Sequence, residues 1–140
     1  LTGLHPDYTH WPPLKKAAES AYAMAGITPE EVDVAEVHDC FSIAEIIATE
    51  ELGFCRKGEG GEFVNQGLSD YGGKVVVNPR GGLIGCGHPL GATGVAQAAE
   101  MYWQLRGEAG ERQVRDARIG LAHNNSGMGE HLVVIYAAGS

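Results

Sequence analysis

Short apolar runs alternate with segments of helical periodicity along the chain, and this alternation limits the folds open to it. Pro12 and Pro13 stand where a helix can begin and Gly26 stands where it can end, with apolar residues at helical spacing between them. The same spacing predicts two more helices, over residues 41–52 and from residue 92 to residue 105. Strands are expected at four apolar runs: 32–37, 75–77, 118–122 and 132–137.

This order favours an α/β fold in which helices pack on a mixed sheet whose last two strands are antiparallel neighbours. We expect one compact domain over residues 1–140. Residues 56–73 are polar and glycine-rich and predict a long surface loop, and residues 78–89 read as a turn too rich in glycine for a helix. Thr28 and Glu31 form a capping-box pattern. The third helix is expected to bury Val95, Ala98, Ala99, Tyr102 and Leu105.

Charge and composition exclude several classes of function. A net charge of -8 and a pI near 5.1 argue against binding to nucleic acid, which needs clustered Lys and Arg. No apolar run is long enough to cross a bilayer, so we expect no membrane segment and a cytoplasmic location. Cys40, Cys55 and Cys86 are widely spaced and are expected to be free thiols. The chain opens on Leu1, so its numbering is expected to begin inside a longer protein.

Three histidines, His38, His88 and His123, each follow a predicted strand or lie in the glycine-rich turn after one. Such turns converge on one edge of an α/β sheet, where imidazoles could exchange protons with a carbonyl substrate. The alternative is a purely structural hydrogen-bonding role. Three histidines can hold zinc, but these lack the close helical spacing of common motifs, and no metal is expected. Glycines beside His88 and after His123 (Gly87, Gly127 and Gly129) would let backbone N–H groups approach a developing oxyanion.

The same turns resemble the thiolase superfamily, in particular the branch of sterol-carrier-protein-x thiolases, nonspecific lipid-transfer thiolases and archaeal acetyl-CoA acetyltransferases. The resemblance runs from Leu14 to Ala138. It is carried by three anchors in order: EVHDCF at 36–41, NPRGG at 78–82 with GHPLGATG at 87–94, and His123-Asn124 with Gly127 and Gly129. It implies the C-terminal half of a thiolase-like fold with a five-stranded type of sheet. It also implies that the N-terminal half, with its acyl-accepting cysteine, lies outside these 140 residues.

The resemblance also implies roles for residues. His88 would activate the missing cysteine and contribute to an oxyanion hole, and His38 would replace the asparagine of other thiolases there. The base that takes the α-proton would be His123, by its register with a C-terminal cysteine, or Cys40 of the HDCF turn. The sequence favours His123 slightly, because an imidazole accepts a proton without first having to lose one.

The implied activity is acetyl-CoA acetyltransferase chemistry, meaning Claisen condensation or thiolysis of a 3-ketoacyl-CoA. Coenzyme A thioesters would be substrates, with no covalently bound cofactor, and this chain alone is expected to be inactive. Expected partners are the N-terminal half, from the same gene or a separate chain, an OB-fold and zinc-ribbon protein, and further copies in a homo-oligomer. Two alternatives stay open: an acyl-CoA retro-aldolase of the same superfamily, in which tyrosines stand for His38 and His88, and a non-catalytic acyl-CoA-binding subunit or scaffold.

Overall fold

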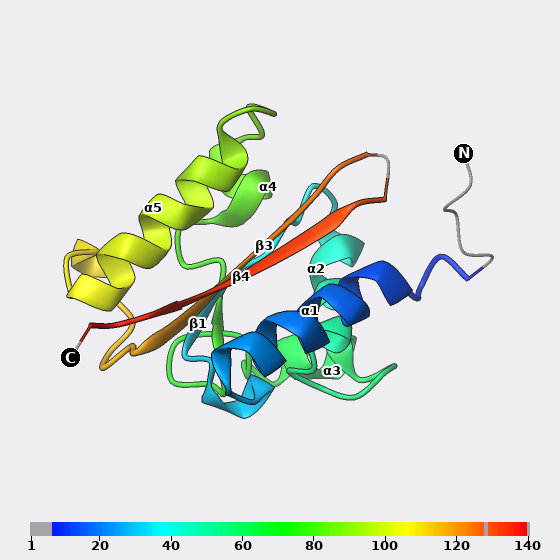
Figure 1. Cartoon of the computed structure of the whole chain (residues 1–140), viewed down its shortest axis with the longest axis horizontal. Coiled ribbons are helices and arrows are strands. Elements are labelled where there is room, and N and C mark those ends of the chain that lie inside the picture. The colour runs from blue at the N-terminus through cyan, green and yellow to red at the C-terminus, as the bar shows by residue number, and fades with distance from the viewer. Residues whose placement is uncertain (1–6, 128, 140) are drawn as a thin grey trace.

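A mixed sheet with helices on both faces forms the domain, as a computed structural model shows (Figure 1). The structure describes residues 7–127 and 129–139, so Leu1 lies outside the described part. Its strands are β1 (Val34–Glu36), β2 (Val76–Val77), β3 (Ile119–Asn125) and β4 (His131–Ala137), in the order β2-β1-β3-β4. β1 is parallel to β2 and to β3, whereas β3 and β4 are antiparallel. The expected α/β class and the antiparallel last pair are confirmed. Four strands, not five, pair in the described residues, one for each apolar run.

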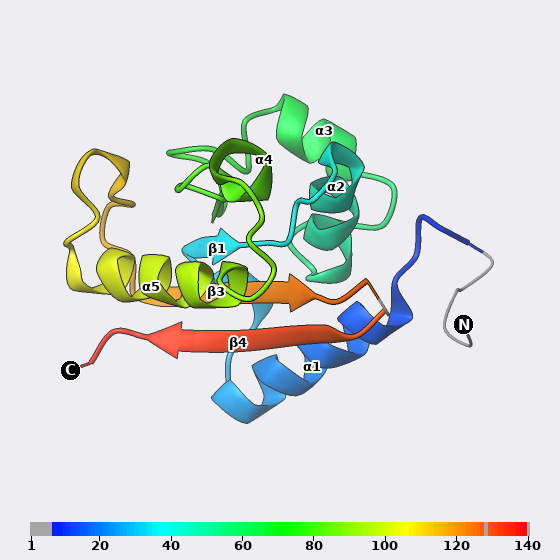
Figure 2. The same cartoon turned by 90° about the horizontal axis from the view of Figure 1, so that it is seen from above.

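Helices α1 (Pro12–Ala25) and α2 (Ser42–Glu51) lie on one side of the sheet, and α5 (Thr93–Arg106) lies on the other (Figures 1 and 2). The α1 side holds the larger apolar core, which includes Leu14, Phe54 and Leu121. Gly26 ends α1 in the left-handed conformation, at φ 69°, as the sequence predicts. The capping box at Thr28 is also present and opens the short 3₁₀-helix Pro29–Glu31; a second 3₁₀-helix spans Gly110–Arg112.

Two segments predicted to lack helix contain one. In the expected loop 56–73, α3 (Gly60–Asn65) forms because Phe63 enters the core and Glu50 accepts a hydrogen bond from the Gly60 N–H at 2.9 Å. Six residues are too few to show a helical period. In the glycine-rich turn, α4 (Gly82–Cys86) forms because the Asp39 carboxylate accepts a hydrogen bond from the Leu83 N–H at 2.6 Å. Tertiary contacts outweigh the poor helix propensity of glycine in both places.

The buried face of α5 is also not the predicted one. Val95 and Tyr102 are 69% and 55% exposed. The side chains that α5 buries are mostly polar: Thr93, Gln97, Glu100, Met101 and Gln104. Gln97 has its polar partners on β3, whereas Glu100 and Gln104 have theirs at Arg112, pairings that apolar periodicity does not reveal. Val95 and Tyr102 of the predicted stripe therefore face outward, while Leu105 packs against the core.

Candidate active site

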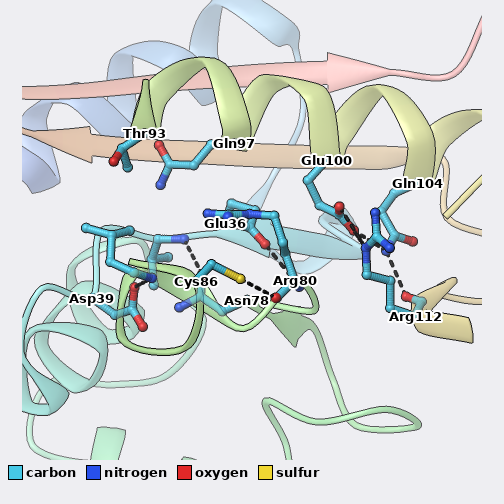
Figure 3. A network of polar contacts seen from close by, with 12 residues as sticks. Glu36, Asp39, Asn78, Arg80, Cys86, Thr93, Gln97, Glu100, Gln104 and Arg112 are labelled. Atoms are coloured by element: carbon cyan, nitrogen blue, oxygen red, sulfur yellow. Dashed lines mark hydrogen bonds and ion pairs between the residues drawn. The ribbon is translucent and has the colours of Figure 1, made fainter. Parts of the chain in front are cut away.

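A polar layer beneath α5 fixes the turns that follow β1 and β2 (Figure 3). Arg80 forms an ion pair with the fully buried Glu36, its Nε 3.5 Å from Oε2. Burial, only partly offset by Arg80, raises the pKa of Glu36 to about 7. The Nε of Arg112 lies 3.0 Å from both carboxylate oxygens of the fully buried Glu100. Buried carboxylates of this kind are kept in place by their cationic partners.

Two backbone constraints join the HDCF turn to the NPRGG turn. The side chain of Asn78, a residue at φ 53°, accepts a hydrogen bond from the Val37 N–H at 2.8 Å. At Gly82, φ is 61°, and an added Cβ would lie 2.1 Å from an oxygen of Asp39. Only glycine fits this approach. The two turns are therefore held side by side.

His38 and His88 meet where these turns converge. Their rings pack edge to face with centroids 4.8 Å apart, and His38 is 3% exposed. Burial, together with the nearby His88, lowers the pKa of His38, so its imidazole is neutral at pH 7. The Asn125 N–H points at His38 Nδ1 from 3.5 Å. Exposed His88 reaches the same point from the loop before α5.

The tautomer of His88 follows from its contacts. Its Nδ1 lies 2.8 Å from the Thr93 hydroxyl oxygen, and that hydroxyl donates its single hydrogen to the Pro89 carbonyl at 3.2 Å. With the hydroxyl hydrogen directed at Pro89, Nδ1 donates to the Thr93 oxygen, and this tautomer leaves the lone pair on Nε2. An imidazole in this state can accept a proton at Nε2.

A hollow of about 1090 Å³ opens beside these rings. Its wall includes His38, His88, Cys40 and Gly127 of the predicted residues. The other three predicted residues, His123, Gly87 and Gly129, are not in this wall. His123 lies fully buried on β3, next to the wall residue Asn124. The sequence therefore predicts that the three turns meet, but not that the His123 side chain is buried while that of Asn124 faces the hollow.

Several residues of the site escaped the sequence analysis. Gln97 of α5 donates to the His123 carbonyl and accepts from the Asn124 side chain, both at 2.9 Å, so it orients the end of β3. His131, the first residue of β4, also lines the hollow. The register of the β3–β4 hairpin could have placed His131 near the site, because it sets His131 opposite Asn125.

The three cysteines are free in the structure, as predicted, with Cys40 and Cys86 exposed. Among the described residues, no group of three His, Cys, Asp or Glu side chains has an arrangement suited to a metal ion. None of the helices in the described part is long and apolar enough to span a membrane.

The fold and these turns define an α/β domain in which histidines line a hollow at the carboxyl ends of parallel strands. Comparison with known families makes the class specific: residues 3–138 match the family described as Thiolase C-terminal domain-like. The chain belongs to this family, so the family resemblance found in the sequence is confirmed.

Two similar proteins illustrate this family assignment. The chain is 54% identical over 125 residues to sterol carrier protein 2 of Rattus norvegicus, a match over 89% of this chain and 23% of that protein. It is 55% identical over 123 residues to an acetyl-CoA acetyltransferase of Methanothermobacter thermautotrophicus, over 88% of this chain and 32% of the relative. The chain thus spans a quarter to a third of the length of these relatives.

A solved structure, described as an Ltp2-ChsH2(DUF35) aldolase, has the same fold. It superposes with a TM-score of 0.85 at 27% identity, covering 96% of this chain and 34% of the other. The thiolase-like fold therefore also occurs in a protein named for a different carbon–carbon bond reaction.

Proposed function

We propose that this chain supplies the histidine-bearing half of a thiolase-type acyltransferase site that acts on coenzyme A thioesters. The observation that carries the proposal is the His38–His88 pair, with its ring centroids 4.8 Å apart, on the wall of the hollow. Similarity to an acetyl-CoA acetyltransferase supports this substrate class. No covalent cofactor is needed for such chemistry.

His88 is the proposed activator of the nucleophile. Because its Nε2 keeps the lone pair and its ring is exposed, it can take the proton of a cysteine thiol brought by another segment. The thiolate then attacks the thioester carbonyl. The carbon–sulfur bond of the thioester breaks, and coenzyme A leaves as a thiol. N–H donors at the hollow would stabilise the oxyanion formed on the way.

The cysteine would come from a partner half seated over the outward face of α5. That face exposes Val95, Tyr102 and Trp103, and the segment before the helix exposes Ile84 and Leu90, all between 39% and 83%. Apolar exposure of this kind beside a site marks a surface for association. The short coverage of the relatives supports an N-terminal half of the same protein, or a separate chain, as the occupant. Association into a homo-oligomer and a further partner protein remain part of the proposal.

Of the two acid–base candidates from the sequence, the hollow is lined by Cys40 and not by His123. A base must come within hydrogen-bond reach of the proton that it removes. The geometry therefore gives Cys40 direct access to a substrate in the hollow, whereas buried His123 has access only through a neighbouring group.

A second candidate function is aldol cleavage of an acyl-CoA, favoured by the solved aldolase of the same fold. That reaction needs no acylated cysteine. The presence of both His38 and His88 supports the thiolase reaction instead. An imidazole that accepts the proton of a cysteine thiol has a role in the thiolase reaction, whereas aldol cleavage involves no cysteine thiol.

Acyl transfer to the cysteine can be tested in the complete protein that contains this chain. We expect acetoacetyl-CoA to acylate one cysteine outside this chain, as seen by intact mass spectrometry. His88→Ala should slow the acylation, whereas His10→Gln, a change at a histidine outside the hollow, should leave its rate unchanged. Acylation of His88→Ala at the wild-type rate would contradict the assignment.

A further inference from the structure

Two imidazoles outside the His38–His88 pair form a unit of their own. His123 Nε2 lies 3.1 Å from His131 Nδ1, and the two ring planes are 13° apart. Such geometry is that of an N–H···N hydrogen bond. Trp11 packs against His131, with ring centroids 5.5 Å apart, and restricts its ring.

The two rings differ in what they can reach. His123 is 0% exposed and does not line the hollow. His131 is partly exposed and lines the hollow together with His38, Cys40 and His88. Of this pair, a substrate held in the hollow can therefore contact only His131.

We propose that His131 is the acid–base residue that takes the α-proton of the thioester, and that His123 is its positioning residue. This assignment rests on the proposed function. The two imidazoles act as one unit, with an exposed member for the chemistry and a buried member behind it.

The proton path follows from the hydrogen bond. For His131 to accept a proton at Nε2, its Nδ1 must carry the hydrogen and donate it to His123 Nε2. The α-carbon then loses a proton to His131 Nε2, its electron pair becomes the enolate, and His131 becomes an imidazolium. The lone pair of His123 Nε2 stabilises this cation by accepting its Nδ1–H, as a buried acceptor does for a catalytic histidine.

The electrostatics of the two rings agree with this division of roles. Burial, followed by the charge of His131 and then that of His38, lowers the pKa of His123 to about 3, so it stays neutral beside the imidazolium. Burial also lowers the pKa of His131, so its imidazole is neutral at pH 7 and ready to accept a proton. A thiol such as that of Cys40 must first lose its own proton before it can act as a base.

The hydrogen bond is tested on the chain itself, labelled with ¹⁵N-histidine. Nitrogen chemical shifts report which ring nitrogen carries the hydrogen, and a scalar coupling across the bond identifies its two nitrogens. We expect His123 to be protonated at Nδ1 and to accept at Nε2. A hydrogen on His123 Nε2 donated to His131 would overturn the proposal, as would the absence of a bond between the rings.

The chemistry is tested by exchange of the acetyl-CoA methyl protons into deuterated water, catalysed by the complete protein. His131→Asn places an amide N–H donor near the position of Nδ1 but cannot act as a base, and His131→Phe keeps only ring bulk. We expect both to reduce exchange by about 10²- to 10⁴-fold, the usual effect of losing a general base. Acylation of the cysteine should persist in both.

The buried partner is tested in the same assay. His123→Leu should reduce exchange, and His123→Gln, which returns an acceptor near Nε2, should recover part of it. Exchange retained in His131→Asn but lost in His131→Phe would make His131 a spacer for His123 and overturn the proposal. Normal exchange in both His131 variants with loss in Cys40→Ser would overturn it in favour of Cys40. A wild-type protein without exchange would refute the proposed function itself.

Discussion

The neutral, buried imidazole of His123 should make the unfolding free energy of the chain fall in acid. The substitution His123→Leu should remove this part of the pH dependence. The pKa of His123 is about 3 in the folded chain, against an ordinary value of 6.5 in the unfolded chain. The unfolded state therefore binds the proton more strongly at any pH between these values. The stabilisation is fully present above pH 6.5 and is lost as the pH falls toward 3.

Its size follows from the shift. Each pH unit below 6.5 should cost about 1.4 kcal/mol until the folded ring titrates. Between pH 6.5 and pH 4.5, the wild-type chain should lose about 2 to 3 kcal/mol more unfolding free energy than His123→Leu, which has no imidazole to protonate. Glu36, whose pKa is raised to about 7, contributes in the opposite direction, but it does so in both proteins and cancels in the difference.

Urea unfolding of both proteins at several pH values measures this difference. Histidine NMR over the same range gives the pKa of His123 directly. Parallel pH dependence of the two proteins, or a His123 ring that titrates near pH 6.5, would refute the argument that this imidazole is buried and neutral.

Three further predictions concern the chain as it stands. Gly82→Ala should destabilise it by about 2 kcal/mol or more, because the residue is at positive φ and its Cβ would meet Asp39; urea unfolding measures the loss, and unchanged stability would contradict the geometry. Tyr22→Phe should cost about 1 to 3 kcal/mol, because the hydroxyl donates to the buried Leu52 carbonyl at 2.8 Å, and a thermal unfolding scan with no shift would argue against that bond. The 140-residue chain alone should show no thiolysis of acetoacetyl-CoA, because we propose that the acylated cysteine lies in another segment, and measurable turnover would disprove this.

Local signals in the sequence predicted most of the fold. The proline start and Gly26 end of α1, the capping box at Thr28 and the four apolar runs each have a short-range physical cause. The two helices that were not predicted depend on residues elsewhere in the chain. α4 needs the Asp39 carboxylate, and α3 needs the core into which its Phe63 packs.

The site was predicted in outline because parallel strands bring the turns after them to one edge. That placed His38 and His88 together, as found. The burial of His123 and the position of His131 depend on strand pairing and on side-chain alternation along β3 and β4, which no motif records. The polar face of α5 was missed for a similar reason, since Gln97 bonds to the His123 carbonyl on β3 and Glu100 to Arg112, both beyond the helix.

The central claim is that this half serves a thiolase reaction, and the fate of coenzyme A tests it most directly. The complete protein should be incubated with a 3-ketoacyl-CoA in the presence and absence of free coenzyme A. We predict that turnover requires free coenzyme A, consumes one molecule per bond cleaved and yields two thioesters. Failure to cleave the 3-ketoacyl-CoA, together with cleavage of a 3-hydroxyacyl-CoA into one thioester and an aldehyde or ketone without consumption of coenzyme A, would contradict the account and identify an aldolase.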